Sequence, residues 1–427
     1  MEPYRVALLG LGTVGRNVVR LLADTADHCA ARAGRAIEVG RIVVADPSRP
    51  REIPDGLPGA AIIDGDSDAA IAADDIDCIV ELVGGEEKPR HWIRTSLEAG
   101  KDVVTANKAV LAVHGEELFD VASSQDRRLY FEASVAAAVP ILQVLQHGIP
   151  AGPVDKLSGI LNGTCNYILG RLEEDYSFEE AVAAAQEAGL AEADPTLDVS
   201  GMDSAHKLAL LARILLGCAV DLDKVRVEGI TNISSEDIFF GHLHNWRLKL
   251  LGTMKRNGKG VSLGVMPRFI SESHPLSGVC EEDNAVLLEA QPFGSLMLQG
   301  KGAGGLPTAG SVVADILRAA RGEAGLLPAS GPLEVLTDPG EDPVRHYVRL
   351  MLPDKPGTLA RVAGALGAQE VGIAAVEQPE RIAGNGEAVP VRFLTHPVPT
   401  TKLDTALAGL DEDLRREAEP VRIRIEE

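Results

Sequence analysis

The fold is decided near the start of the chain, at Arg5-Val-Ala-Leu-Leu-Gly10-Leu-Gly12-Thr13-Val14-Gly15-Arg16. Arg5–Leu9 is an apolar run that predicts a buried strand, and Arg16–Ala23 has helical spacing. The glycines between them follow the pattern G-x-G-x-x-G, which permits a tight turn, close approach of a pyrophosphate and close packing of helix on strand. We therefore expect a dinucleotide's phosphates at the helix N-terminus, held by Gly10, Gly12, Thr13, Val14 and Gly15. A merely structural glycine turn is the alternative.

Strand and helix signals keep alternating over about 130 residues. The expected strands are Glu38–Ala45, Asp77–Val83 and Asp102–Thr105, and the expected helices are Glu87–Ala99 and Ala109–Ser123. This alternation predicts an α/β domain built on a doubly wound parallel sheet with helices on both faces.

The end of the second strand should recognise the adenosine ribose. Asp46 could hold a ribose diol, whereas Arg49 or Arg51 could hold a 2′-phosphate. The alternative is a solvated charged loop. Acid and base together leave the choice between NAD and NADP open.

Composition excludes several classes of protein. The chain has 427 residues and a net charge of −22, which repels nucleic acid. No apolar run approaches the roughly 20 residues that span a membrane, and no secretory segment opens the chain. Five scattered cysteines fit a reducing cytoplasm and argue against a cysteine-based zinc site.

The sharpest chemical signal lies between residues 191 and 207. Lys207 follows Asp203 by four residues, so both lie on one face of a helix whose continuation, Leu208–Leu216, is apolar almost all round. A lysine at the edge of a buried helix beside carboxylates suits proton transfer, although a structural ion pair is the alternative. Carboxylates in this number also suit a substrate with an ammonium group, and the candidates are Glu192, Asp194, Asp198 and Asp203.

Polar residues also follow two strands of the first domain, at Glu81–Gly85 and Thr105–Lys108. Ligands of such sheets bind beyond the carboxyl ends of the strands. Lys108 could therefore reach a substrate carbonyl or hydroxyl, and an ordinary surface lysine is the alternative.

Taken together, these segments resemble the homoserine dehydrogenases. The resemblance covers about residues 1–325 and rests on the glycine loop, Glu81–Gly85, Gly100–Lys108, Glu132–Val135, Gly159–Leu169, the acidic stretch to Lys207, and Gly302–Gly305 before Thr308-Ala309. It implies NAD(P)-linked interconversion of L-homoserine and L-aspartate 4-semialdehyde, in threonine, methionine and isoleucine biosynthesis, by a cytoplasmic homodimer or homotetramer.

The resemblance also implies roles for single residues. Lys207 would be the general acid and base, with Lys108 assisting. The substrate contacts would be Glu192, Asp198 and Asp203, and further cofactor contacts would be Gly84, Asn107, Lys108 and Gly304.

A sodium or potassium ion is implied as well, held by Glu132, Val135, Ala137 and Val139. The family usually has two glycines where this chain has Ala137–Ala138, and the added Cβ atoms could restrict that loop. Members that use NADP often carry an arginine where this chain has Ala45, although Arg49 could compensate.

The tail, Tyr347-Val-Arg-Leu-Met-Leu-Pro-Asp354-Lys-Pro-Gly357-Thr-Leu-Ala-Arg-Val-Ala, resembles an ACT domain, a ferredoxin-like amino-acid sensor. It implies feedback control by an amino acid such as threonine, and a domain that only assists assembly is the alternative. We thus expect a dinucleotide-binding domain at 1–133 completed by about 301–330, an α+β catalytic and dimerisation domain at 134–300, a linker at 331–344 and an ACT domain at 345–427.

Two other functions remain open at this point. The chain could be a dehydrogenase of another amino-acid aldehyde or ketone, or a nucleotide- and amino-acid-binding sensor without catalysis.

Overall fold

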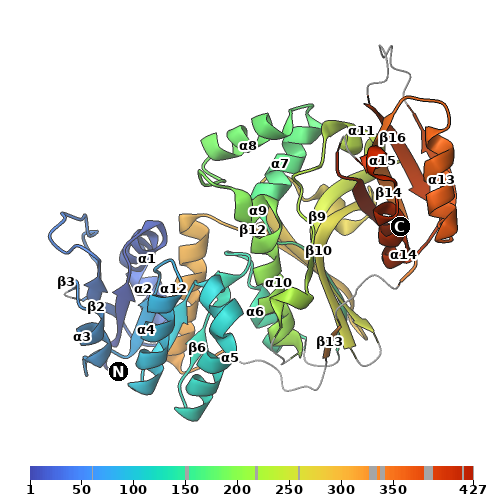
Figure 1. Ribbon diagram of the computed structural model, residues 1–427. Coiled ribbons are helices and arrows are strands. Elements are labelled where there is room, and N and C mark those ends of the chain that lie inside the picture. The colour runs from blue at the N-terminus through green and yellow to red at the C-terminus, as the bar shows by residue number, and fades with distance from the viewer. Residues whose placement is uncertain are drawn as a thin grey trace.

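The computed structural model describes residues 1–426 apart from 60, 150–152, 217–219, 258–259, 327–333, 337–341, 379–387 and 416–417. Three regions follow one another across the molecule, from the N-terminal sheet through the central sheet to the C-terminal strands (Figure 1). Among the helices of this described part, none has the length and apolar character that a membrane crossing requires.

The N-terminal region is a six-stranded parallel sheet with the order β3-β2-β1-β4-β5-β6. Its strands are β1 Tyr4–Leu9, β2 Ile37–Val43, β3 Ile62–Asp64, β4 Cys78–Glu81, β5 Asp102–Thr105 and β6 Leu129–Tyr130. Its helices are α1 Thr13–Asp24, α2 Ala26–Ala33, α3 Ser67–Ala72, α4 Glu87–Glu98 and α5 Lys108–Ser124. The order confirms the predicted doubly wound sheet and puts its crevice between β1 and β4, where the strand order reverses.

Helix α12, Gly305–Arg321, follows the central region in sequence and packs back on this sheet (Figure 1). Its buried face, with Val312 and Ile316, shares a core with Val6 and Leu8 of β1. Approach to α1 is so close that a Cβ at Gly305 would lie 2.7 Å from the Thr13 side chain. The glycine at this position therefore allows the two helix starts to meet.

The central region is built on a mixed sheet. Its strands are β7 Val154–Ile160, β8 Arg226–Val227, β9 Trp246–Asn257, β10 Gly260–Ser271, β11 Asp283–Ala290 and β12 Gly294–Lys301. Its helices are η1 Glu132–Ser134, α6 Ile141–Gln143, η2 Val144–Gly148, α7 Gly163–Glu173, α8 Phe178–Glu187, α9 Thr196–Val199, α10 Met202–Leu216, η3 Leu222–Lys224, α11 Ser235–Leu243 and η4 Pro275–Gly278. Helix α10 is buried along most of its length, as its apolar sequence predicts.

The C-terminal region has the order β-α-β-β-α-β, with the additional short helix α15 before the last strand. It comprises β14 Arg345–Pro353, α13 Thr358–Ala368, β15 Ile373–Glu377, β16 Ala388–Thr395, α14 Thr400–Ala408, α15 Glu412–Arg415 and β17 Val421–Glu426. The strands lie in the order β17-β14-β16-β15, and the neighbouring pairs are antiparallel.

The last strand joins the two sheets into one. β17 pairs in parallel with β10, with Arg424 opposite Arg268 and Glu426 opposite Ile270. The same edge of β10 also pairs with β8 and with β13, Glu334–Leu336. The segment expected to be a linker, 331–344, thus contains a strand of the central sheet, while 331–333 and 337–341 lie outside the described residues.

Candidate active site

The glycine loop has the geometry that its spacing predicts. Gly10 has φ +106°, and a Cβ there would lie 2.9 Å from the Leu82 carbonyl oxygen. A Cβ at Gly15 would come within 2.3 Å of the Gly10 carbonyl oxygen. By contrast, a Cβ at Gly12 would meet no described atom within 4 Å, so the space above it is open to a ligand. Two glycines thus serve the packing, and the third leaves room for a phosphate.

A cleft of about 1680 Å³ opens beside this loop and extends past the ends of β2 and β4. Gly10, Gly12 and Gly84 line it, whereas Thr13 and Val14 begin helix α1 at its edge. Gly304 has φ +112° and precedes α12, which packs against α1. The residues present therefore fit a dinucleotide, with its phosphates at the N-terminus of α1.

The ribose end of the cleft carries charges of both signs. Its lining includes Arg16, Arg20, Arg49 and Arg51 together with Glu52, Asp55 and Asp68. Asp46 instead turns its carboxylate to the Ser48 amide at 3.0 Å and to the Ser48 hydroxyl at 2.6 Å. These hydrogen bonds lower the pKa of Asp46. The acid expected to hold a ribose diol is thus engaged in its own turn.

Two lysines from different regions meet on one carboxylate. Lys207 on α10 has its Nζ 2.8 Å from Asp203 Oδ2, and Lys108, the first residue of α5, has its Nζ 3.0 Å from Asp203 Oδ1. Asp203 and Lys207 are both buried, whereas 40% of the Lys108 side chain is exposed. Asp203 and Lys207, which the helical spacing places on one face, are therefore joined by Lys108, the lysine that follows β5.

The partners of Asp203 keep its carboxylate ionised. Burial alone would raise the pKa of Asp203, but the ammonium groups of Lys207 and Lys108 hold it well below its usual value. Asp203 also lies in the first turn of α10, where the helix dipole favours an anion. The carboxylate thus stays ionised between the two lysines.

Three residues of this site escaped sequence reasoning. The Leu161 carbonyl accepts from Lys207 Nζ at 2.7 Å and from Asn284 Nδ2 at 2.9 Å. Asn162 donates through Nδ2 to Asp198 at 2.6 Å and to Asp203 at 2.8 Å. A carbonyl leaves no sequence signal, and the structure alone shows that Gly302 leaves room for Asn284, because a Cβ there would lie 1.9 Å from the Asn284 side chain.

The other acids expected at the site differ in their surroundings. Asp198 is half-buried, and burial raises its pKa. Asp194 accepts from the Thr196 amide and hydroxyl and is a turn residue. Glu192 is exposed on the segment between α8 and α9. That segment is held near α7 by a hydrogen bond from the Thr164 hydroxyl to the Leu190 carbonyl.

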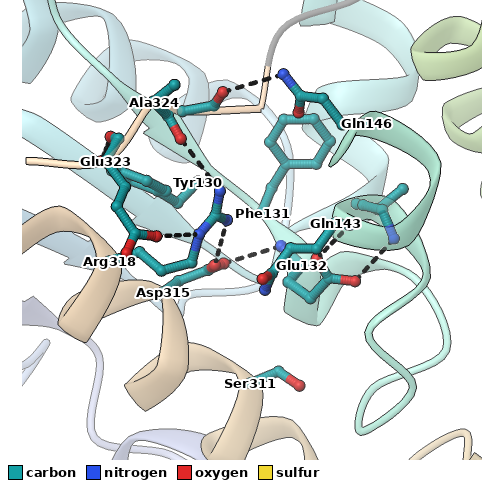
Figure 2. Close-up of polar contacts among 12 residues, drawn as sticks. Tyr130, Phe131, Glu132, Gln143, Gln146, Ser311, Asp315, Arg318, Glu323 and Ala324 are labelled. Atoms are coloured by element: carbon teal, nitrogen blue, oxygen red, sulfur yellow. Dashed lines mark hydrogen bonds and ion pairs between the residues drawn. The ribbon is translucent and has the colours of Figure 1, made fainter. Parts of the chain in front are cut away.

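Oxygens of the loop expected to hold a monovalent cation accept hydrogen bonds, and Figure 2 shows those of Glu132. The buried Glu132 carboxylate accepts from the amides of Leu142 and Gln143 at 2.8 and 3.0 Å. The Ala137 carbonyl accepts from Ser311 at 2.6 Å, and the Val139 carbonyl accepts from an amide. The ion expected at this loop stays a prediction, and we assign no step to it.

Two further observations describe this loop. Burial, with Asp315 close by, raises the pKa of Glu132 to about 8, while Arg318 lies 3.3 Å from the Asp315 carboxylate. Ala136 and Ala137 have φ values of 52° and 38°. Both lie in the left-handed region that favours glycine, and of the pair Ala137–Ala138 named from the sequence this applies to Ala137.

Comparison with known proteins follows the same division of the chain. A family model described as the homoserine dehydrogenase NAD-binding domain matches residues 10–132, and one described as homoserine dehydrogenase matches residues 140–317. Homoserine dehydrogenase of Corynebacterium glutamicum is 40% identical over 88% of this chain and 86% of its own length. That of Pseudomonas aeruginosa is 36% identical over 100% of both chains. A crystal structure of a homoserine dehydrogenase from Thiobacillus denitrificans has a TM-score of 0.88 and 32% identity, covering 100% of this chain and 99% of that one.

The doubly wound sheet and the glycine loop, together with the matched family models, define an NAD(P)-dependent oxidoreductase. Identity and coverage narrow this class to one family. The chain belongs to the homoserine dehydrogenases.

Proposed function

We propose that this chain interconverts L-homoserine and L-aspartate 4-semialdehyde, with Lys207 as general acid and base and Lys108 assisting in the same site. The observation that carries the proposal is the arrangement of Lys207, Asp203 and Lys108, because it joins a buried proton carrier to the end of a nucleotide-binding sheet. A catalytically inactive sensor would have no use for two lysines gathered on one buried acid.

The chemistry follows from the hydrogen bonds of Lys207. A bound nicotinamide supplies or accepts the hydride. Of the three N–H bonds of the Lys207 ammonium, one points to Asp203 and one to the Leu161 carbonyl. The third has no partner among the described residues and is available to the substrate oxygen. During reduction it protonates the developing alkoxide, and the neutral amine then regains a proton from water.

The acids beside the lysines suit the substrate's ammonium group. We place the substrate contacts of Asp198 and Asp203 beside Lys207 and Lys108, and that of Glu192 on the exposed segment between α8 and α9. Glu192 would reach the substrate from that segment, which contacts α7 next to Asn162.

For the cofactor we infer a preference for NADP(H) over NAD(H). The arginines that line the cleft suit a 2′-phosphate and outnumber the nearby acids Glu52, Asp55 and Asp68, whereas Asp46 is not among the lining residues and accepts from the Ser48 hydroxyl.

We further infer that residues 345–427 are a ferredoxin-like ACT domain that binds an amino-acid effector. The β-α-β-β-α-β order supports this fold. A cavity of about 310 Å³ lies at the turn between β14 and α13, where Gly357 has φ +90°. We also propose a homodimer or homotetramer, since edge strand β12 is largely exposed.

The test is Lys207→Met, assayed by oxidation of NADPH and of NADH with L-aspartate 4-semialdehyde. We expect kcat to fall on the order of 10³-fold while NADPH affinity changes little, because general acid catalysis is lost and the cleft is untouched. Lys402→Met, on the exposed side of α14, is the matched control. Normal turnover by Lys207→Met would contradict the mechanism, and wild-type turnover only on a different aldehyde would contradict the substrate.

A further inference from the structure

A buried carboxylate lies beneath the point where the cofactor cleft and Lys108 meet. Glu81 is the last residue of β4 and has no exposed surface. Its Oε1 accepts from the Val83 amide at 2.6 Å, and its Oε2 accepts from the Thr105 hydroxyl at 2.5 Å. The Thr105 oxygen in turn accepts from the Asn107 amide at 3.0 Å. Glu81 thus connects the ends of β4 and β5.

The residues that Glu81 holds are joined a second time by the Asn107 side chain. Its Oδ1 caps α5 by accepting from the Val110 amide at 3.2 Å. Its Nδ2 donates to the carbonyls of Val83 at 3.0 Å and Gly85 at 2.8 Å. Lys108 is the first residue of α5, so the turn at 83–85 and the start of the lysine-bearing helix form one hydrogen-bonded unit.

This unit lies between the two halves of the candidate active site. Val83 and Gly84 line the cofactor cleft, and Lys108 reaches Asp203 on the central region. A shift of the turn would therefore move the cleft wall and the lysine together. Misplacement of reacting groups by about 1 Å can cost two orders of magnitude in rate.

We propose that Glu81 is a positioning residue, whose carboxylate fixes the 83–85 turn and the start of α5 so that Lys108 and the nicotinamide are aligned for hydride transfer. The proposal rests on the proposed function, and Glu81 itself touches neither substrate nor cofactor.

The direction of the hydrogen bonds makes this positioning depend on charge. The ionised carboxylate accepts from both Val83 and Thr105, which leaves the Thr105 oxygen to accept from Asn107. A proton on Oε2 would turn that oxygen into a donor and leave the Thr105 hydroxyl without its acceptor. Ionised Glu81 is therefore the form that completes the unit.

The surroundings of Glu81 bring this titration close to neutral pH. Burial raises the pKa of Glu81 to about 7, although the hydrogen bonds from Thr105, Val83 and Asn107 oppose it. Among the residues that the structure describes, the groups that face it are uncharged: Leu9 pairs with it from β1, and the Thr105 hydroxyl and Asn107 amide face it from β5 and α5. Protonation as the pH falls through about 7 should thus weaken the alignment.

The test is Glu81→Gln, with kcat measured from pH 5.5 to 9. We expect wild-type kcat to rise through about pH 7, while the variant stays flat through that range at about one tenth of the wild-type plateau. NADPH binding, followed by nicotinamide fluorescence, should change less than kcat. A variant with the wild-type plateau and an unchanged inflection would overturn the proposal.

Thr105 provides a second pair of variants that leaves Glu81 in place. Thr105→Ser keeps the hydroxyl and should behave as wild type, whereas Thr105→Val removes it and should lower kcat and move the inflection upward. Thr105→Val with wild-type kcat and pH profile would overturn the proposal even if Glu81→Gln does not fold. Wild-type enzyme without turnover on the semialdehyde would instead count against the proposed function.

Discussion

At the residue scale, Asp203 is the buried carboxylate on which the two lysines of the site converge. It is buried, and two lysines and Asn162 donate to it. We expect Asp203→Asn to lower the free energy of unfolding at pH 7 by about 2–3 kcal/mol, because removal of one member of a buried ion pair leaves its partner uncompensated. Urea denaturation measures the change. The same variant should lower kcat, since the Lys207 ammonium loses its ionised partner.

The pH dependence of this effect has a definite sign. A carboxylate whose pKa is depressed by folding stabilises the native state above its unfolded pKa, and that stability is lost as the pH falls below about 4. The difference between Asp203→Asn and wild type should therefore shrink below pH 4. Exposed Asp194→Asn is the control and should change stability by less than about 0.5 kcal/mol. Equal effects of the two variants at pH 7 would contradict this account.

The sequence could predict only part of the site at this scale. The contact of Asp203 with Lys207 follows from helical spacing, and it is present. Leu161 contacts Lys207 across 46 residues of sequence, and Asn162 contacts Asp203 across 41. Asn284 contacts the Leu161 carbonyl across 123 residues, so these contacts depend on the packing of β11 and α7. No local pattern encodes such contacts. At Asp46 a local contact was missed: its carboxylate accepts from the hydroxyl of Ser48, two residues further along the chain.

At the element scale, different glycines of the loop serve folding and cofactor binding. A Cβ at Gly15 would collide with the Gly10 backbone, whereas a Cβ at Gly12 would project into open space. We expect Gly12→Ala to keep the wild-type melting temperature and to raise the KM for NADPH about tenfold or more, because the methyl occupies the phosphate's place. Gly15→Ala should lower the melting temperature as well. Thermal unfolding together with NADPH titration distinguishes them, and a destabilised Gly12→Ala would refute the distinction.

The elements themselves were predictable where periodicity was long or turn signals were strong. The predicted strand Asp102–Thr105 matches β5, and the predicted helix Glu87–Ala99 differs from α4 by one residue. β3 and β6 have only three and two residues, too few to show a period. The pairing of β17 with β10 could not be predicted, because register between segments 150 residues apart is set by tertiary packing.

At the scale of the whole molecule, the C-terminal region is bound to the central sheet as well as following it in sequence. The Tyr347 hydroxyl and the Arg349 guanidinium both donate to buried Asp237 on α11, at 2.6 and 2.7 Å. Removal of 345–427 would leave this carboxylate without them and expose the edge of β10. We therefore expect the truncated chain to have a lower melting temperature and to aggregate.

Regulation has to be tested by a milder change than truncation. Asp354→Ala alters the lining of the cavity beside Gly357 and leaves β17 in place. We expect it to weaken the response of the enzyme to threonine or a related amino acid while the melting temperature stays unchanged. Steady-state assays with and without the amino acid measure this. A full-length enzyme that responds to no amino acid would contradict the sensor assignment.

The shared sheet also has a mechanical consequence. On β10, the Val265 side chain lies against the turn at Gly201, where a Cβ would be 3.3 Å from it, and Asp203 follows two residues later. Backbone pairing thus connects β15, β16, β14, β17 and β10, and a side-chain contact from β10 reaches the turn before the helix that bears Asp203 and Lys207. A displacement of the C-terminal strands would therefore reach the turn at Gly201 through β10 and the contact of Val265.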